Sequence, residues 1–299
     1  LTAVRAEAPR LKALTDSVFN ELSGRPSFDV YGDYANKVLC LNAGYNLGLD
    51  RDESLAARDL IDQMILQREP GQVGGASPKA AAATGALAGL LANHVARIRK
   101  NPALAGPQGQ ALLNAEVDGK RLSDEDLTAY LFSLLVVGSE TTPMAVAGAL
   151  YYLDKHPTQK AAIFEDRSLV AKAFQETCRF DQPTNMLARR AAKDFELNNA
   201  HIQKGDNLLF IYASANRDEQ RFENADSFDI FRENRGDLSF GVGAHFCLGA
   251  HLARAIGEML IAKVIDNVSD NTVIEDQCER AYGEHLNGFI RMTIKADWK

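Results

Sequence analysis

The segment from Phe240 to Gly249 constrains this chain of 299 residues most strongly. It reads Phe-Gly-Val-Gly-Ala-His-Phe-Cys-Leu-Gly, and an apolar helical pattern follows it. The glycines let the backbone turn tightly and approach a flat ligand closely. Cys247 falls just before the expected helix, where unpaired N–H groups and the helix dipole stabilise a thiolate. A thiolate can bind a metal ion, whereas a cysteine considered alone is usually a small buried apolar residue.

Other kinds of binding site fit the residues of this loop less well. A phosphate-binding loop is excluded because Phe246 stands where the dinucleotide motif needs its third glycine, and no Gly-Lys-Ser/Thr follows. The cysteines are widely spaced and form no CxxC pair, which argues against a zinc site or a dense disulfide framework and favours a reducing compartment. They are Cys40, Cys178, Cys247 and Cys278.

Charge and hydropathy limit the partners. The net charge of −7 argues against general binding to nucleic acid or to an anionic membrane. No secretory signal is visible, and the longest apolar stretch falls short of a membrane span. We therefore expect a cytoplasmic protein.

The sequence predicts a mainly α fold with a small β region. A long helix should begin after Ser123, which makes a capping box with Asp126, and run for about 50 Å to His156. A shorter helix is expected over 169–180, a flexible break at 71–77, and an irregular loop over 216–237. Short strands are expected at 195–197, 201–203 and 208–212, separated by turn residues.

Helices at the two ends of the chain carry apolar faces with helical spacing. The first face comprises Val4, Ala8, Leu11, Leu14, Val18 and Leu22, and the last helix should turn Leu248, Leu252, Ile256, Met259 and Leu260 inward.

Three patterns that contain charged residues allow more than one interpretation. Glu140 and Thr141 interrupt the apolar run 131–137 of the long helix; Glu140 either points to solvent or is buried and hydrogen-bonded for a purpose. Glu176 and Arg179 share a helix face at i, i+3, a spacing that usually marks surface pairs. Arg189, beside Arg190, is ordinarily just a solvated charge.

The cysteine segment matches every fixed position of Phe-Gly-x-Gly-x-His-x-Cys-x-Gly, the heme-binding pattern of the cytochrome P-450 superfamily, which the chain therefore resembles. The resemblance implies heme b (iron protoporphyrin IX), with Cys247 as the ligand to the iron. It places Phe240 beside the sulfur and His245 at a heme propionate, with Gly241 and Gly249 among the cofactor-binding positions.

The same resemblance assigns roles in the long helix. Gly138 opens a groove beside the heme, Thr141 hydrogen-bonds dioxygen or a water, and Glu140 supplies protons. Val137 departs from the family, which usually has alanine or glycine there, and its bulk narrows the pocket. We expect Val137, Leu134, Asn185 and Met186 to line the substrate pocket.

Elsewhere the resemblance implies that Arg189 binds a heme propionate. It also makes Glu176 and Arg179 a buried structural pair beneath the heme. The usual third partner is an arginine before Phe228, but this chain has Ser227. Arg221 or Arg232 is the expected substitute.

The implied activity is that of a bacterial-type monooxygenase that hydroxylates an apolar small molecule with dioxygen. Electrons would come from NAD(P)H indirectly, through a ferredoxin or flavoprotein. The alternatives are a non-catalytic heme-thiolate protein or carrier-docking domain, a helical interaction protein without heme, and a peroxide-driven or rearranging relative. We expect one heme domain over residues 1–299, lacking the N-terminal part of the family fold.

Overall fold

The structure is a computed structural model that describes residues 2–65, 76–233, 235–281, 283 and 285–299. Most of the expected break at 71–77 lies outside these residues. The larger helices are α1 (Thr2–Asn20), α2 (Asn36–Leu47), α3 (Arg51–Ile65), α4 (Pro78–Lys100), α5 (Pro107–Leu113), α6 (Asp124–Lys155), α7 (Pro157–Glu165), α8 (Leu169–Phe180) and α10 (Ala250–Asn267). Shorter helical segments are the π-helix η1 (Val30–Ala35), the 3-10 helices η2 (Pro102–Leu104) and η3 (Gly243–His245), and α9 (Tyr212–Ala215).

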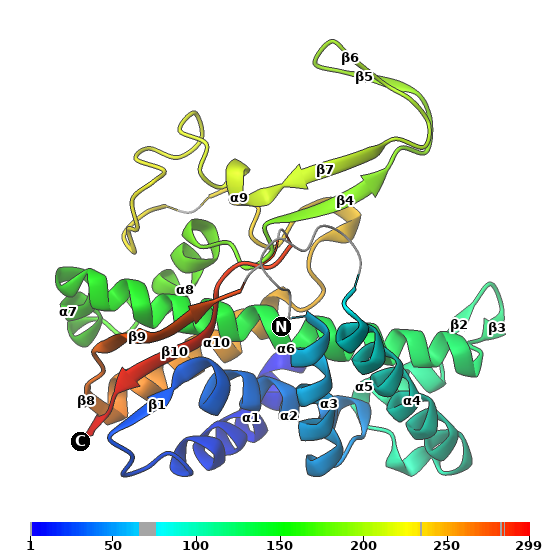
Figure 1. Cartoon of the computed structure of the whole chain (residues 1–299), viewed down its shortest axis with the longest axis horizontal. Coiled ribbons are helices and arrows are strands. Elements are labelled where there is room, and N and C mark those ends of the chain that lie inside the picture. Colours follow the sequence, from blue (N-terminus) through cyan, green and yellow to red (C-terminus); the bar gives the residue numbers. More distant parts are fainter. Residues whose placement is uncertain (1, 66–75, 234, 282, 284) are drawn as a thin grey trace.

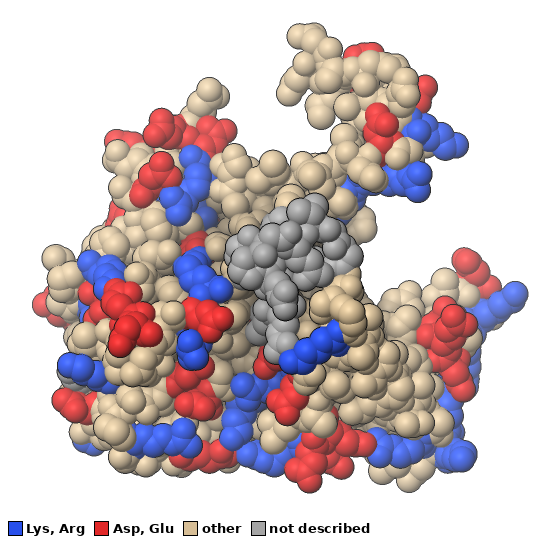
Figure 2. Space-filling view, in the orientation of Figure 1, with Lys and Arg blue, Asp and Glu red and all other residues tan. Residues whose placement is uncertain are grey.

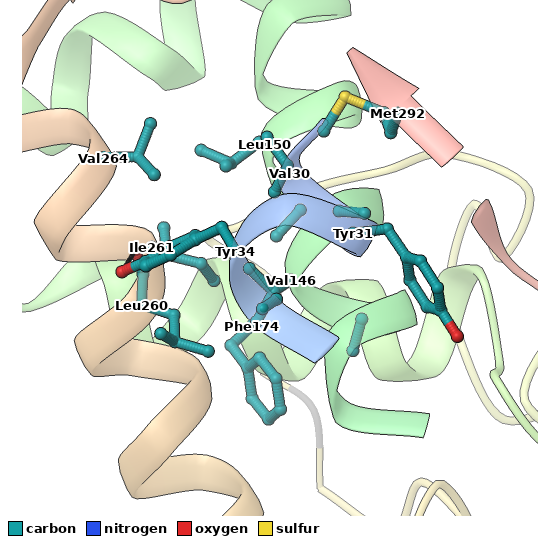
Figure 3. Close-up of a cluster of buried hydrophobic side chains, with 14 of the residues drawn as sticks. Val30, Tyr31, Tyr34, Val146, Leu150, Phe174, Leu260, Ile261, Val264 and Met292 are labelled. Carbon is teal, nitrogen blue, oxygen red and sulfur yellow. Dashed lines mark hydrogen bonds between the residues drawn. The ribbon is translucent and has the colours of Figure 1, made fainter. Parts of the chain in front are cut away.

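Helix α6 organises the described chain, because it crosses from α4 and α5 at one end to α7 and α8 at the other (Figure 1). Ser123 caps it with the predicted capping box to Asp126. Its first half contributes Leu127, Leu131 and Leu135 to one apolar cluster, together with residues of α2, α3, α4 and α5. Its second half packs into a larger cluster with α1, α8, α10 and β10 (Phe289–Lys295), part of which is drawn in Figure 3.

By length and composition α6 would also suffice to cross a membrane. However, 61% of its apolar window is buried inside the protein, as expected for a core helix. Its apolar surface is thus largely used by packing within the chain.

The strands extend beyond the predicted β region. Of the expected strands, β7 (Asn207–Ile211) pairs antiparallel with β4 (Met186–Arg190), which was not predicted as a strand, and β5 (Phe195–Leu197) forms a hairpin with β6 (Ala200–Ile202). Asn198 and Asn199 form its tight turn with positive φ angles of 49° and 64°. The unpredicted part is a sheet in the order β1 (Ser27–Asp29), β10, β9 (Val273–Arg280), with the small pair β8 (Val268–Asp270) and β11 (Asp297–Trp298). A further two-residue hairpin, β2 (Glu116–Val117) with β3 (Lys120–Arg121), precedes α6.

The β4–β7 ribbon with the β5–β6 tip forms an arm that extends away from the helices (Figure 1). Figure 2 shows that the surface is deeply hollowed between this arm and the helices at the α4 end of the molecule. Large apolar side chains of the arm are exposed, among them Leu209 and Ile211 of β7. The described chain thus leaves an open apolar wall.

Candidate functional site

The cysteine loop has a defined backbone conformation. Gly241 and Gly243 have φ angles of 67° and 70°, in the left-handed region that favours glycine. The Cys247 N–H donates a 2.8 Å hydrogen bond to the Phe240 carbonyl, which closes the loop. The guanidinium of Arg254 lies 4.3 Å from the centre of the Phe240 ring and covers it. The loop is therefore fixed at its base, while its tip is open.

Cys247 is a free, half-buried cysteine. A Cβ built on Gly249, the N-cap of α10, would lie 3.9 Å from its sulfur, so Sγ lies beside the start of that helix. The helix begins later than expected, at Ala250. Leu248 therefore precedes it and is 90% exposed, and the prediction that Leu248 faces inward is wrong.

Two of the side chains predicted to bind heme propionates lie near the surface. His245 is exposed in η3, and Arg189 is half-buried in β4. Among the described residues neither forms an ion pair with a carboxylate, and the Arg189 side chain donates only to the neighbouring Ala188 carbonyl, at 2.9 Å. Both remain available to an anion.

The α6 segment Val137–Thr141 lies where the helix passes from the first apolar cluster to the second. Val137, Gly138 and Thr141 share one face, because residues three and four apart are neighbours on a helix. This face is open: Val137 is 65% exposed. A Cβ on Gly138 would meet only the Ala43 Cβ, at 3.9 Å.

Of the two alternatives for Glu140, the structure shows the buried and hydrogen-bonded one, not the one that points to solvent. Its carboxyl is buried, 2% exposed, and accepts a 2.8 Å hydrogen bond from the Tyr31 hydroxyl. Figure 3 shows that hydroxyl directed away from the apolar cluster to which the Tyr31 ring belongs. Burial, with repulsion from Asp62, raises the pKa of Glu140 to about 7, against the hydrogen bond from Tyr31, which lowers it.

Tyr31 and Asn36 are site residues that the sequence did not indicate. Tyr31 lies in the π-helix η1, and Asn36 is its C-cap and the first residue of α2; the Asn36 N–H donates to the Tyr31 carbonyl. The Asn36 amide donates to the Tyr31 hydroxyl at 3.3 Å and to Glu140 Oε1 at 3.5 Å. No sequence pattern marks these two residues. The signal comes from the structure, because π-turns occur frequently at functional sites.

Glu176 and Arg179 are both fully buried and form a bidentate ion pair with distances of 2.8 and 2.9 Å. The remaining Arg179 N–H groups donate to the carbonyls of Asn216, Ala225 and Ser227. The pair is therefore structural, not a surface pair.

The missing third arginine is replaced by Arg232, whose Nε lies 3.3 Å from Glu176 Oε1. Arg221, the other expected substitute, instead donates to the Arg235 carbonyl. In the family pattern Ser227 stands where arginine is usual; here its carbonyl accepts from both Arg179 and Arg232.

The expected substrate-pocket residues lie on two separate elements. Val137 and the half-buried Leu134 belong to α6, whereas Asn185 and Met186 lie at the start of β4. The Asn185 N–H donates to the His285 carbonyl, and the Met186 carbonyl contacts the His285 ring at 3.0 Å. No hydrogen bond among the described residues joins the two groups.

Comparison with known proteins agrees with this arrangement. The family "Cytochrome P450" matches residues 85–297. The chain belongs to the cytochrome P450 family. It is 36% identical over 269 residues to cytochrome P450 123 of Mycobacterium tuberculosis, covering 90% of this chain and 66% of that protein. It is 33% identical over 276 residues to cytochrome P450 107B1 of Saccharopolyspora erythraea, covering 90% and 65%.

A solved P450, CYP109Q5 from Chondromyces apiculatus, superposes on 100% of this chain and 74% of its own with a TM-score of 0.86 and 26% identity. The mainly α P450 fold predicted from the sequence is thus confirmed. The chain spans slightly less than two thirds of the length of the two curated relatives.

The P450 family implies a heme group, and the residues of the cysteine loop fit one. Among the described residues no cluster of three or more His, Cys, Asp or Glu side chains is present that could hold a metal ion by itself. A site with one protein thiolate suits an iron whose other ligands come from a porphyrin. The tip of the loop leaves space, since a Cβ on Gly243 would meet no atom within 4 Å.

Proposed function

We propose that this chain is a heme-thiolate monooxygenase domain that hydroxylates an apolar small molecule. One observation carries the proposal: Cys247 is a free, half-buried thiol at the start of α10, in a loop closed by its own N–H and turned by two left-handed glycines. Cys247 would ligate the heme iron, with Phe240 beside the sulfur. When bound, the heme supplies the activation of dioxygen.

The remaining polar residues have separate tasks in this proposal. His245 and Arg189 would bind the carboxylates of the heme, for which their lack of carboxylate partners among the described residues is the support. The Thr141 hydroxyl, on the open face of α6, would donate a hydrogen bond toward dioxygen or a water. Glu140 would hold the proton that Thr141 passes on, since its pKa of about 7 is suited to both taking up and releasing a proton.

The substrate is proposed to be apolar. Val137 offers exposed apolar surface on α6, and Leu134, Asn185 and Met186 would complete the lining with few polar groups. The electrons would come from NAD(P)H through a ferredoxin or flavoprotein. All four cysteines are free, which supports a reducing, cytoplasmic location.

A non-catalytic heme-thiolate protein or carrier-docking domain is the second candidate. The open space at Gly138 and the exposure of Val137 would serve either function. The buried, hydrogen-bonded Glu140 favours the monooxygenase, because burying an ionisable group has a cost that a purely structural helix does not require.

The carbon monoxide difference spectrum of the reduced chain, reconstituted with heme, tests the proposal. We expect the band of a thiolate-ligated heme in the wild type and its loss in Cys247→Ala. Cys278→Ala is the matched control, since Cys278 is also free and partly exposed.

Absence of heme binding by the wild type would refute the proposal. A thiolate spectrum without turnover, when electrons and a panel of apolar substrates are supplied, would favour the non-catalytic candidate.

A further inference from the structure

A buried polar cluster lies beside Glu140, between η1, α2, α3 and α6. On the inner side Tyr31 and Asn36 contact the Glu140 carboxyl. On the outer side are Arg58 and Asp62, one turn apart on α3, with 3.9 Å between Arg58 Nε and Asp62 Oδ2. Arg58 also donates to the Gly32 carbonyl of η1 at 2.8 Å, which joins α3 to η1.

Buried polar atoms in this cluster lack a hydrogen-bond partner among the described residues. They are Asn36 Oδ1, Arg58 Nε and Asp62 Oδ1. Nearly all such atoms in folded proteins are paired with protein or with ordered water. Two acceptors and one donor within one polar cluster are the kind of partners that a buried water requires.

Asp62 also reaches the surface. Its side chain is 30% exposed although Oδ1 is buried. Glu140, in contrast, is 2% exposed and contacts solvent hardly at all. The cluster therefore extends from solvent at Asp62 to the enclosed carboxyl of Glu140.

We propose that water bridges Asn36, Arg58 and Asp62, and that Asp62 with this water forms the route by which protons from solvent reach Glu140. Tyr31 is the positioning residue that holds the Glu140 carboxyl at the inner end. The use of these protons rests on the proposed function, but the existence of the route does not.

Each transfer along the route is balanced. Asp62 gains a proton from solvent and gives it to the bridging water, which in turn gives a proton to Glu140. The water is unchanged, and the net result is one proton gained by Glu140. The Tyr31 hydroxyl keeps its own proton, because burial raises the pKa of this phenol well above its ordinary value.

The charges around Glu140 are consistent with a relay between the two carboxyls. The ionisable groups that face it are Tyr31 of η1, Cys40 of α2, and Arg58 and Asp62 of α3. Burial raises the pKa of Asp62 to about 6 and that of Glu140 to about 7. Both carboxyls can therefore take up and release a proton near neutral pH.

Infrared spectroscopy of the chain without heme tests the route directly. The carboxylic-acid band that disappears in Glu140→Gln reports the protonation of Glu140. After a rapid drop in pH, we expect Asp62→Asn to slow the appearance of this band by about tenfold, as a modest added barrier would. At equilibrium Asp62→Asn should lower the pKa of Glu140, and Tyr31→Phe should raise it. Asp52→Asn, an exposed carboxyl in the first turn of the same helix, is the control and should change neither.

Glu140 protonation that is as fast in Asp62→Asn as in the wild type would overturn the proposal, as would shifts of equal sign in the two variants. The chain is measured without heme, so a failure of heme binding refutes the proposed function and leaves this result independent. In the heme-loaded protein, Asp62→Asn should also increase the solvent isotope effect on turnover.

Discussion

The hydroxyl of Tyr31 donates a 2.8 Å hydrogen bond to Glu140, although 109 positions separate the two residues. The bond is possible because Asp29 caps η1: its carboxylate accepts from the Tyr31 N–H at 3.0 Å and from the Met292 N–H at 2.9 Å. The β1–β10 pairing thus holds Tyr31 in place, and Tyr31 in turn positions the carboxyl of Glu140 in α6.

Glu140 should make the stability of the chain depend on pH. Its pKa rises from an ordinary value of 4.5 to about 7 in the folded state. A raised carboxyl pKa means that the folded chain binds the proton more tightly than the unfolded chain. The contribution of Glu140 to the free energy of unfolding is therefore most favourable below pH 4.5, and it falls until pH 7 is passed. Above pH 7 the charged Glu140 should therefore lower the free energy of unfolding by about 3 kcal/mol, and Glu140→Gln should remove this loss.

Urea unfolding at pH 5 and pH 8 measures this effect as a difference between the wild type and Glu140→Gln. We expect the wild type to lose stability relative to the variant as the pH rises. A constant difference over this interval would contradict the raised pKa that burial gives to Glu140.

Local signals explain what the sequence could predict. The capping box of Ser123 and the end of α8 before Pro183 depend on neighbouring residues, and both are as predicted. The contact of Tyr31 with Glu140 depends on the packing of η1 against α6, which no local pattern marks. Leu248 was misplaced because helical periodicity extends into the loop, whereas Gly249 caps the helix only after it.

The Arg179–Glu176 pair should be among the most sensitive points of the fold. Arg179→Lys keeps the charge but cannot make the two-pronged bond, and it leaves carbonyls of the 216–227 segment without a donor. We expect a loss of about 3 kcal/mol or more in the free energy of unfolding. Arg291→Lys, in the exposed pair with Glu279, should cost less than about 1 kcal/mol. Similar losses in the two variants would show that burial of the first pair is unimportant.

Arg232 should contribute to the stability of the fold, whereas Arg221 should not. Arg232 reaches Glu176 and also donates to the carbonyls of Asn224 and Ser227, so it fastens the irregular segment to α8. Arg232→Ala should lower stability by about 1–3 kcal/mol and increase protease cleavage within residues 216–233. The Arg221→Ala control should leave the cleavage rate close to that of the wild type; the reverse ranking would mean that Arg221 is the third partner.

Thr141→Ala should separate electron consumption from product formation. The hydroxyl lies on the open face of α6, and its loss removes the donor that the proposed function assigns to proton transfer. We expect NAD(P)H oxidation to continue while hydrogen peroxide rises and hydroxylated product falls, measured as the ratio of peroxide to product. An unchanged ratio would remove Thr141 from the mechanism.

Gly138 and Gly89 offer a paired test of the open face of α6. Both are helical glycines with space for a Cβ, since Gly138 would meet only Ala43 at 3.9 Å and Gly89 would meet nothing within 4 Å. Alanine at either position should therefore raise the free energy of unfolding by about 0.5–1 kcal/mol, because it restricts the unfolded chain. Their effects on heme and substrate should differ: Gly138→Ala narrows the space beside Thr141 and should weaken substrate binding in a spectral titration, whereas Gly89→Ala in α4 should leave it unchanged. If both variants gain stability and bind substrate like the wild type, the face of α6 around Gly138 does not border the substrate.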